Sequence, residues 1–153
     1  MSGSTWAAGH ILYTGILTNQ YQNGYIDRWA DFVTATASNV NQTVLGPSGN
    51  AFSTAVITCR CQGHITSAGS GTTVGAGFYI ESRAYYTKIS GTLSSLGSMT
   101  IANLTDSGVF DTVNSFCIAT QSGTTLGCSI NPVTNSGTLG TMAATIYVEA
   151  TYN

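Results

Sequence analysis

The chain has 153 residues, of which 42% are hydrophobic and only 7% are charged, and its net charge is −2. Four Lys and Arg cannot build a phosphate-binding patch or a polybasic membrane anchor, which excludes nucleic acid and a charged membrane surface as partners. No apolar run reaches the roughly 18 residues of a membrane-spanning helix.

Alternation with Thr, Val, Ile and Tyr runs along most of the chain, and clusters of Gly, Ser and Asn interrupt it. A period of two indicates β-strands, and the interrupting clusters indicate turns. Tyr25–Thr36 is expected to form one bent strand or two short ones. The predicted strands are, in chain order, His10–Thr18, Tyr25–Thr36, Gln42–Leu45, Ala51–Ile65, Val74–Thr87, Ser98–Leu104, Val109–Thr112, Ser115–Thr120, Leu126–Ile130 and Thr141–Tyr152.

Three of these strands also indicate which face is buried. Glu81 and Arg83 share one face of their strand, and we expect that face to be the wetter one. On the other two strands small and apolar residues recur at every second position, so we expect them to face inward. The expected inward residues are Ala55, Ile57, Cys59 and Cys61 in the first strand and Met142, Ala144, Ile146, Val148, Ala150 and Tyr152 in the last.

About eight to ten short strands without a convincing helix predict an all-β protein, an antiparallel β-sandwich. A jelly-roll-like topology is our first choice. An immunoglobulin-like sandwich is the alternative, although the Cys…Trp…Cys order of that family is missing. We expect residues 1–9 to form a flexible N-terminal arm and residues 10–153 to form a single β-sandwich domain.

The four cysteines fall into two groups. Cys59 and Cys61 lie two apart on one strand face, a spacing that does not favour a bridge between them. Cys117 and Cys128 flank a predicted hairpin, and a two-residue turn at Ser122-Gly123 would place them opposite each other within disulfide range. Cys117 and Cys128 are therefore a candidate disulfide, the alternative being two buried thiols packed across the hairpin.

The supply of catalytic groups is small. The chain has two His, four Asp and two Glu, and it contains no G-x-S-x-G nucleophile motif, no Asp-rich calcium loop and no Cys-x-x-Cys pair. We therefore expect no catalytic residue, no metal site and no cofactor, and a protein that is not an enzyme. A small hydrolase is kept as a third alternative, because converging residues of a catalytic site need not form a motif.

The aromatic residues are the more suggestive group. Eight Tyr and two Trp on a charge-poor sandwich suit either subunit contacts or stacking against sugars. Trp6 and Trp29 are the candidate partner or sugar contacts. Trp6 lies in the predicted arm, where it would either anchor on a neighbouring molecule or fold back over its own core.

Three further features of the sequence are taken together. Two predicted turns are rich in Ser, Thr and Gly, at Ser122–Gly127 and Ser136–Gly140. The first residues do not read as a secretory leader, and a final strand is expected at Ala143–Asn153. In these features the chain resembles bacteriophage virion structural proteins, the small β-sandwich subunits that decorate capsids or form fibre tips. The resemblance implies a homo-oligomer, with a trimer favoured, that contacts other virion proteins and has no cofactor. It also implies a location in the virion, assembled in the host cytoplasm.

The sequence thus predicts a virion structural protein, first of all a capsid decoration (cement) or minor capsid subunit that stabilises a particle through subunit contacts. The alternative is a carbohydrate-binding or receptor-binding fibre-tip module, which would contact a glycan on the host surface.

Overall fold

The computed structural model describes residues 11–19, 22–35, 40–42, 53–123 and 125–152, with the backbone alone before residue 53. Nine strands and no helix occur in these residues, and all strand pairs are antiparallel. The strands are β1 (Ile11–Asn19), β2 (Gln22–Ala35), β3 (Val40–Gln42), β4 (Thr54–Ala68), β5 (Gly77–Ile89), β6 (Thr92–Thr105), β7 (Phe116–Ser122), β8 (Thr125–Asn131) and β9 (Gly140–Tyr152). The predicted all-β antiparallel sandwich is confirmed.

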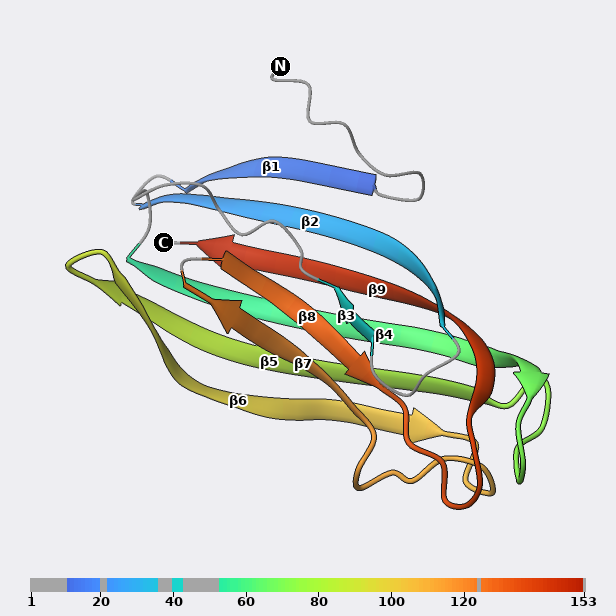
Figure 1. Cartoon of the computed structure of the whole chain (residues 1–153). Coiled ribbons are helices and arrows are strands. Elements are labelled where there is room, and N and C mark those ends of the chain that lie inside the picture. Colours follow the sequence, from blue (N-terminus) through green and yellow to red (C-terminus); the bar gives the residue numbers. More distant parts are fainter. Residues whose placement is uncertain (1–10, 20–21, 36–39, 43–52, 124, 153) are drawn as a thin grey trace.

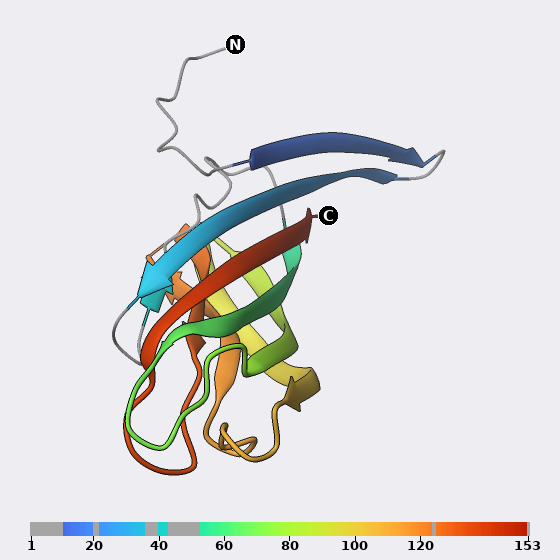
Figure 2. The same cartoon turned by 90° about the vertical axis from the view of Figure 1, so that its right-hand side faces the viewer.

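The strands form two sheets of unequal size. The large sheet has the order β1-β2-β9-β4-β5-β6, and the small sheet has the order β3-β8-β7. Figure 1 shows the small sheet packed across one side of the large sheet, and Figure 2 shows its other side left uncovered. The final strand β9 lies between β2 and β4, so the end of the chain occupies the middle of the large sheet.

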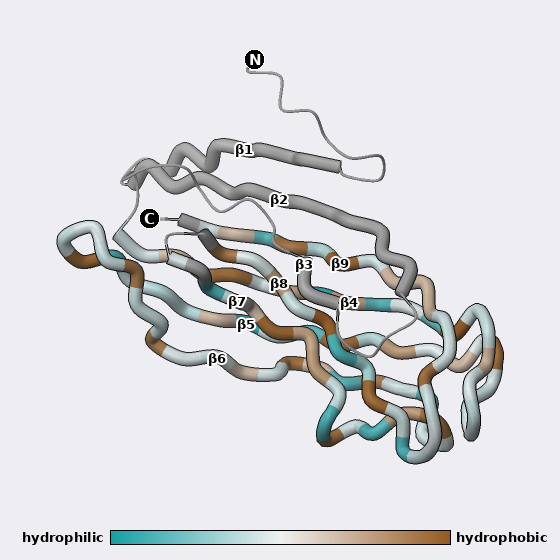
Figure 3. The backbone as a smooth tube through the Cα atoms, viewed as in Figure 1, coloured by the Kyte–Doolittle hydropathy of each residue, from teal (hydrophilic) through white to brown (hydrophobic). Residues whose placement is uncertain are grey.

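The core lies between the two sheets and is built by every second residue of β4, β5 and β9. Ile57, Cys59 and Cys61 of β4 are at most 1% exposed, and so are Ala144 and Ile146 of β9. Figure 3 shows hydrophobic positions alternating with hydrophilic ones along these strands. The inward sets predicted for the two strands are confirmed wherever their side chains are described.

Two disulfides join the sheets, and they correct the predicted pairing. Cys59 is bonded to Cys128, and Cys61 is bonded to Cys117, so Cys117 and Cys128 are not bonded to each other. The hairpin register is the reason. Ser122 pairs with Thr125, so the turn lies one residue later than predicted, and Cys117 pairs with Ile130 while Cys128 pairs with Ala119. The two hairpin cysteines are thereby offset along their strands, and each faces one cysteine of β4.

Hydrogen bonds between the sheets add to the disulfides. The buried hydroxyl of Ser82 donates to the backbone carbonyl of Cys117. The side-chain amide of Gln121 donates to the carbonyl of Leu93 at 2.9 Å. Because a buried polar group is costly when unpaired, the bond of Ser82 in particular fixes the position of the small sheet on the large one.

The predicted strand Val109–Thr112 is wrong. This segment lies in the loop between β6 and β7, where only Phe110 forms an isolated bridge, to Thr134. The carboxylate of Asp111 accepts hydrogen bonds from the backbone N–H groups of Val113 and Asn114, which turns the chain. The side-chain amide of Asn114 also donates to this carboxylate, at 2.6 Å, and this bond, followed by the two backbone bonds, holds the pKa of Asp111 below its ordinary value. The loop nevertheless contributes to the core, since Phe110 is 1% exposed.

Several predictions fall on residues outside the described ranges. The predicted flexible arm at residues 1–9, with Trp6, lies there, as does the end of the strand predicted at Gln42–Leu45. The remaining strands are found within a few residues of their predicted positions, except that β6 begins earlier, at Thr92. It does so because Ser90 and Gly91 adopt positive φ and form a tight turn after β5.

Candidate functional site on the outer face of the large sheet

The side of the large sheet that faces away from the small sheet carries an unusual set of side chains. We define the outer face by the large polar and aromatic residues of β4, β5 and β9 that alternate with the core residues: Arg60, Gln62, Tyr79, Glu81, Arg83, Tyr85, Tyr147 and Glu149. Four of the seven charged residues from residue 53 onward belong to it. In a chain with so few charges, more than half of the charged side chains that the structure describes thus lie on this face.

Register brings these residues together across three strands. Arg60 of β4 lies opposite Glu81 of β5 on one side and opposite Tyr147 of β9 on the other. The next row along the sheet places Gln62 between Tyr79 and Thr145. Since neighbouring strands lie about 4.8 Å apart, each row is a compact set of adjoining side chains.

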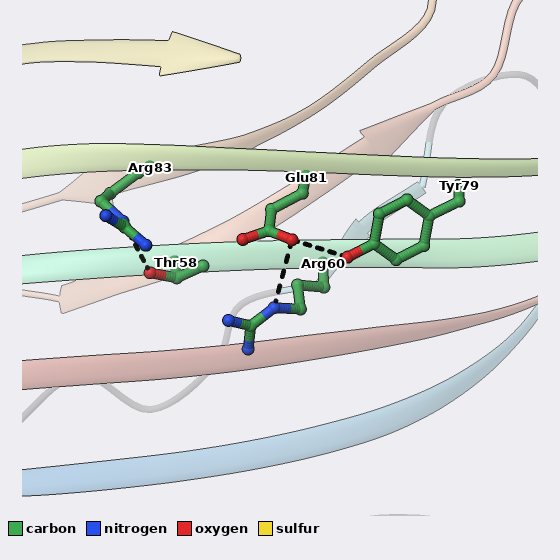
Figure 4. Close-up of polar contacts among 5 residues, drawn as sticks. All are labelled: Thr58, Arg60, Tyr79, Glu81 and Arg83. Atoms are coloured by element: carbon green, nitrogen blue, oxygen red, sulfur yellow. Dashed lines mark hydrogen bonds and ion pairs between the residues drawn. The ribbon is translucent and has the colours of Figure 1, made fainter. Parts of the chain in front are cut away.

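Glu81 is the centre of a polar cluster, shown in Figure 4. Its carboxylate accepts a hydrogen bond from the hydroxyl of Tyr79 at 2.6 Å, and the guanidinium Nε of Arg60 lies 3.4 Å from the same oxygen. The hydrogen bond to Glu81, followed by burial and by the charge of Glu81, raises the pKa of Tyr79 above its ordinary value of 10.0. The Tyr79 ring is thereby held in one orientation beside the carboxylate.

Arg83 lies on the same face of β5 but outside this cluster. Its Nε donates a long hydrogen bond, of 3.4 Å, to the hydroxyl of Thr58. Two tyrosines offer open rings on the same face: Tyr85 is 36% exposed and Tyr147 is 44% exposed. The face therefore combines aromatic surface with charged hydrogen-bonding groups.

A groove of about 390 Å³ crosses one end of this face, between β9, β4 and β5. Gln62, His64, Tyr79 and Thr145 lie along it. It is hollow because His64 has Gly77 opposite it on β5 and Ala143 opposite it on β9, and neither residue fills the space. An exposed amide, an imidazole and a phenol ring thus border a recess open to solvent.

The predicted contacts Trp6 and Trp29 do not define this site. Trp6 lies outside the described residues, and for Trp29 the structure gives only its place in β2, paired with Leu12 and Val148. The sequence pattern places Tyr79 and Tyr85 on the same wet face as Glu81 and Arg83. It also places Arg60 on the outward face of its strand, but it does not show that these two faces adjoin or that Tyr147 lies beside Arg60. The signal was the alternation itself; the missing knowledge was that β9 and β5 flank β4.

The residues that the structure describes also bear on metal and membrane binding. Those residues contain no group of three or more His, Cys, Asp and Glu side chains placed to hold a metal ion. Nor do they form a helix that is long and apolar enough to pass through a lipid bilayer.

Comparison with known proteins gives one structural similarity. No family model matches the sequence, and no curated protein matches it. Among solved structures, the chain is similar to the tailspike protein of Acinetobacter baumannii phage AM24, with a TM-score of 0.46 and 10% identity over 84% of this chain. The chain spans only 26% of the length of that tailspike chain. No residue role is transferred from it.

Proposed function

We propose that this chain is a carbohydrate-binding structural subunit of a virus particle and that the outer face is its glycan-binding surface. The observation that carries the proposal is the concentration of tyrosine, arginine and glutamate side chains on one exposed sheet face of a chain that is otherwise poor in charge. The location in a virion is supported by the turn-rich, low-charge sequence and its resemblance to phage structural subunits.

The chemistry of sugars fits this surface. A pyranose ring presents a face of C–H groups, which packs against an aromatic ring, and a rim of hydroxyls, which bond to carboxylates, amides and guanidinium groups. From Val56 to His64 the outer side of β4 extends over about 26 Å, at about 3.3 Å per residue, which accommodates several sugar residues in a row. The groove beside Tyr79 would hold one of them.

The rigid frame supports the same function. Two disulfides and the cross-sheet hydrogen bonds fix the strands that carry the site. The protein therefore loses little conformational entropy when a ligand binds. Sites built on strands hold their side chains more firmly than sites on loops. The outer face is therefore a preformed platform.

The test is binding of the purified chain to a glycan array, followed by calorimetry with the glycans that bind. Tyr79→Ala and Tyr147→Ala each remove an aromatic ring from the face. Each is expected to weaken glycan binding by about tenfold, because the ring would be covered by the bound sugar. Ile118→Ala is the matched control, because Ile118 is exposed on the small sheet and lies on the opposite side of the sandwich. Absence of any glycan binding, or equal loss in the control, contradicts the proposal.

A second function, capsid decoration, is favoured by a different observation. Strand β6 is an edge of the large sheet, and four of its apolar side chains are 45–68% exposed: Leu96, Met99, Ile101 and Leu104. Exposed apolar surface on a sheet edge suits contact with another subunit. We propose a second copy of this chain as the occupant.

The mass of the protein in solution and its co-sedimentation with particles test this second function. We expect an oligomer, with a trimer favoured, that dissociates when Leu96 and Leu104 are both replaced by Ser. A wild-type chain that stays monomeric and does not sediment with particles contradicts it.

A further inference from the structure

The two arginines of the outer face are in different states. Arg60 is paired with Glu81, whose remaining hydrogen bond goes to Tyr79. Arg83 forms no ion pair within the described residues, and its one hydrogen bond is the long contact from Nε to the neutral hydroxyl of Thr58. Figure 4 shows Arg83 reaching over β4 toward Thr58, while Glu81 contacts Tyr79 and Arg60. The charge of Arg83 is thus not matched by an acid in direct contact among the side chains that the structure describes.

The surroundings of Arg83 leave room for a ligand. On β6, Met99 lies opposite Arg83 and Gly97 lies opposite Tyr85. Gly97 has no side chain, and a side chain built there would meet open space. The ring of Tyr85, two residues from Arg83 on the same face, is therefore uncovered on its β6 side.

Glu149 is the other acid on this face, and it bears on the balance of charge. Thr58 lies between Arg83 and Glu149 in register, so the two charges stand on strands that are separated by β4. Glu149 takes part in an interaction of its own. A half-buried guanidinium that has no acid in contact among the described residues is a ready partner for a carboxylate, which it can bind with two parallel hydrogen bonds.

We propose that Arg83 and Tyr85 form a subsite for an acidic sugar, in which the guanidinium binds the carboxylate and the ring of Tyr85 packs against the C–H face of the pyranose. This inference rests on the proposed glycan-binding function and narrows it to glycans that contain a carboxylate. The rest of the outer face, with the Tyr79 groove, binds the neighbouring sugar residues.

The experiment compares uronate-containing oligosaccharides with their carboxyl-reduced counterparts, which keep the same rings and linkages. The wild-type chain is expected to bind the acidic form at least about fivefold more tightly, since charge-assisted hydrogen bonds are stronger than neutral ones. The factor is modest because solvent weakens such bonds on an open protein surface. This preference is expected to shrink at high salt. Arg83→Gln is expected to abolish the preference, so that the acidic and the reduced forms bind to this variant with similar affinity.

Three further variants separate the effect of charge from that of geometry. Arg83→Lys keeps the charge but loses the paired hydrogen bonds, and it is expected to retain only part of the preference. Lys88→Gln removes a positive charge near the C-terminal end of β5, and this variant is expected to retain the full preference for the acidic form. Tyr85→Ala is expected to weaken both forms of the glycan alike, because the ring packs against the part that they share.

The outcomes distinguish the two levels of the proposal. Equal affinity of the wild-type chain for acidic and reduced oligosaccharides overturns the acidic subsite and leaves the glycan-binding function standing. A preference that persists in Arg83→Gln overturns the assignment to Arg83. Binding to no glycan at all overturns both.

Discussion

The two faces of the large sheet are made of alternate residues of the same strands, yet they obey opposite constraints. On the inner face of β9, Met142, Ala144 and Ile146 are at most 1% exposed and pack against the small sheet. On the outer face of the same strand, Tyr147 is 44% exposed and has no covering layer in the described structure. A single step along the chain thus separates a residue that stabilises the core from one that is open to solvent.

The disulfides give the largest expected effect on the inner side of this comparison. Replacing Cys59 and Cys128 together by Ala removes a crosslink that spans 69 residues. Because the Cys61–Cys117 disulfide remains, the loop that this crosslink closes in the unfolded chain is only about 15 residues long. Its removal is expected to lower the free energy of unfolding by about 3 kcal/mol, because the unfolded chain gains entropy. Guanidinium denaturation of the variant and the wild type under oxidising conditions measures the loss. A decrease of less than about 1 kcal/mol would show that the crosslink contributes little to holding the sheets together.

Ile146 and Tyr147 are adjacent residues on opposite faces, and they form the next test. Ile146→Ala opens a cavity in the core and is expected to reduce the free energy of unfolding by about 2–5 kcal/mol. Tyr147→Ala on the outer face is expected to cost less than about 1 kcal/mol while it weakens glycan binding. Denaturation and calorimetry on both variants measure the two effects. Equal destabilisation by the two substitutions would contradict the separation of the faces.

The sequence predicts which face of a strand is buried, but it does not predict how the strands pair or how the sheets stack. Alternation in β4 and β9 was enough to identify inward residues such as Ile57 and Ile146, because a buried face must be apolar over its whole length. The pairing of Cys59 with Cys128 was not predictable, since it requires the register of a hairpin and the stacking of one sheet on another. The outer site was missed for the same reason, as Arg60, Tyr147 and Glu81 come from strands that are distant in sequence.

A smaller effect is expected at Gly63, which faces the core between Phe78 and Ala144. A Cβ atom at this position would lie 2.5 Å from the carbonyl oxygen of Ala143 and 2.8 Å from the Phe78 ring. Gly63→Ala is therefore expected to lower the free energy of unfolding by about 1–3 kcal/mol, because the backbone has to shift. Its neighbour Gln62 is exposed on the outer face, and Gln62→Ala is expected to stay within about 0.5 kcal/mol. Thermal or denaturant unfolding measures both changes in the free energy of unfolding. No destabilisation by Gly63→Ala would show that the strands are less closely packed at this point.

The smallest effect concerns the ionisation of Tyr79 on the outer face. Its hydrogen bond to Glu81 raises its pKa above 10.0 in the folded protein, so the protonated phenol is favoured by folding. The corresponding stability is fully present below pH 10 and is lost as the pH rises through the raised pKa.

Glu81→Gln removes the charged acceptor and leaves Arg60 without its acid, and both changes are expected to lower the pKa of Tyr79 toward its ordinary value. Ultraviolet difference titration measures this shift, with Tyr79→Phe to assign the signal among the tyrosines. Glu149→Gln is the control, because it removes a carboxylate from the same face without touching the Tyr79 hydrogen bond. If Tyr79 titrates alike in Glu81→Gln and in the wild type, the phenol is not held by Glu81 in solution, and the outer face is less preorganised for a ligand than its contacts imply.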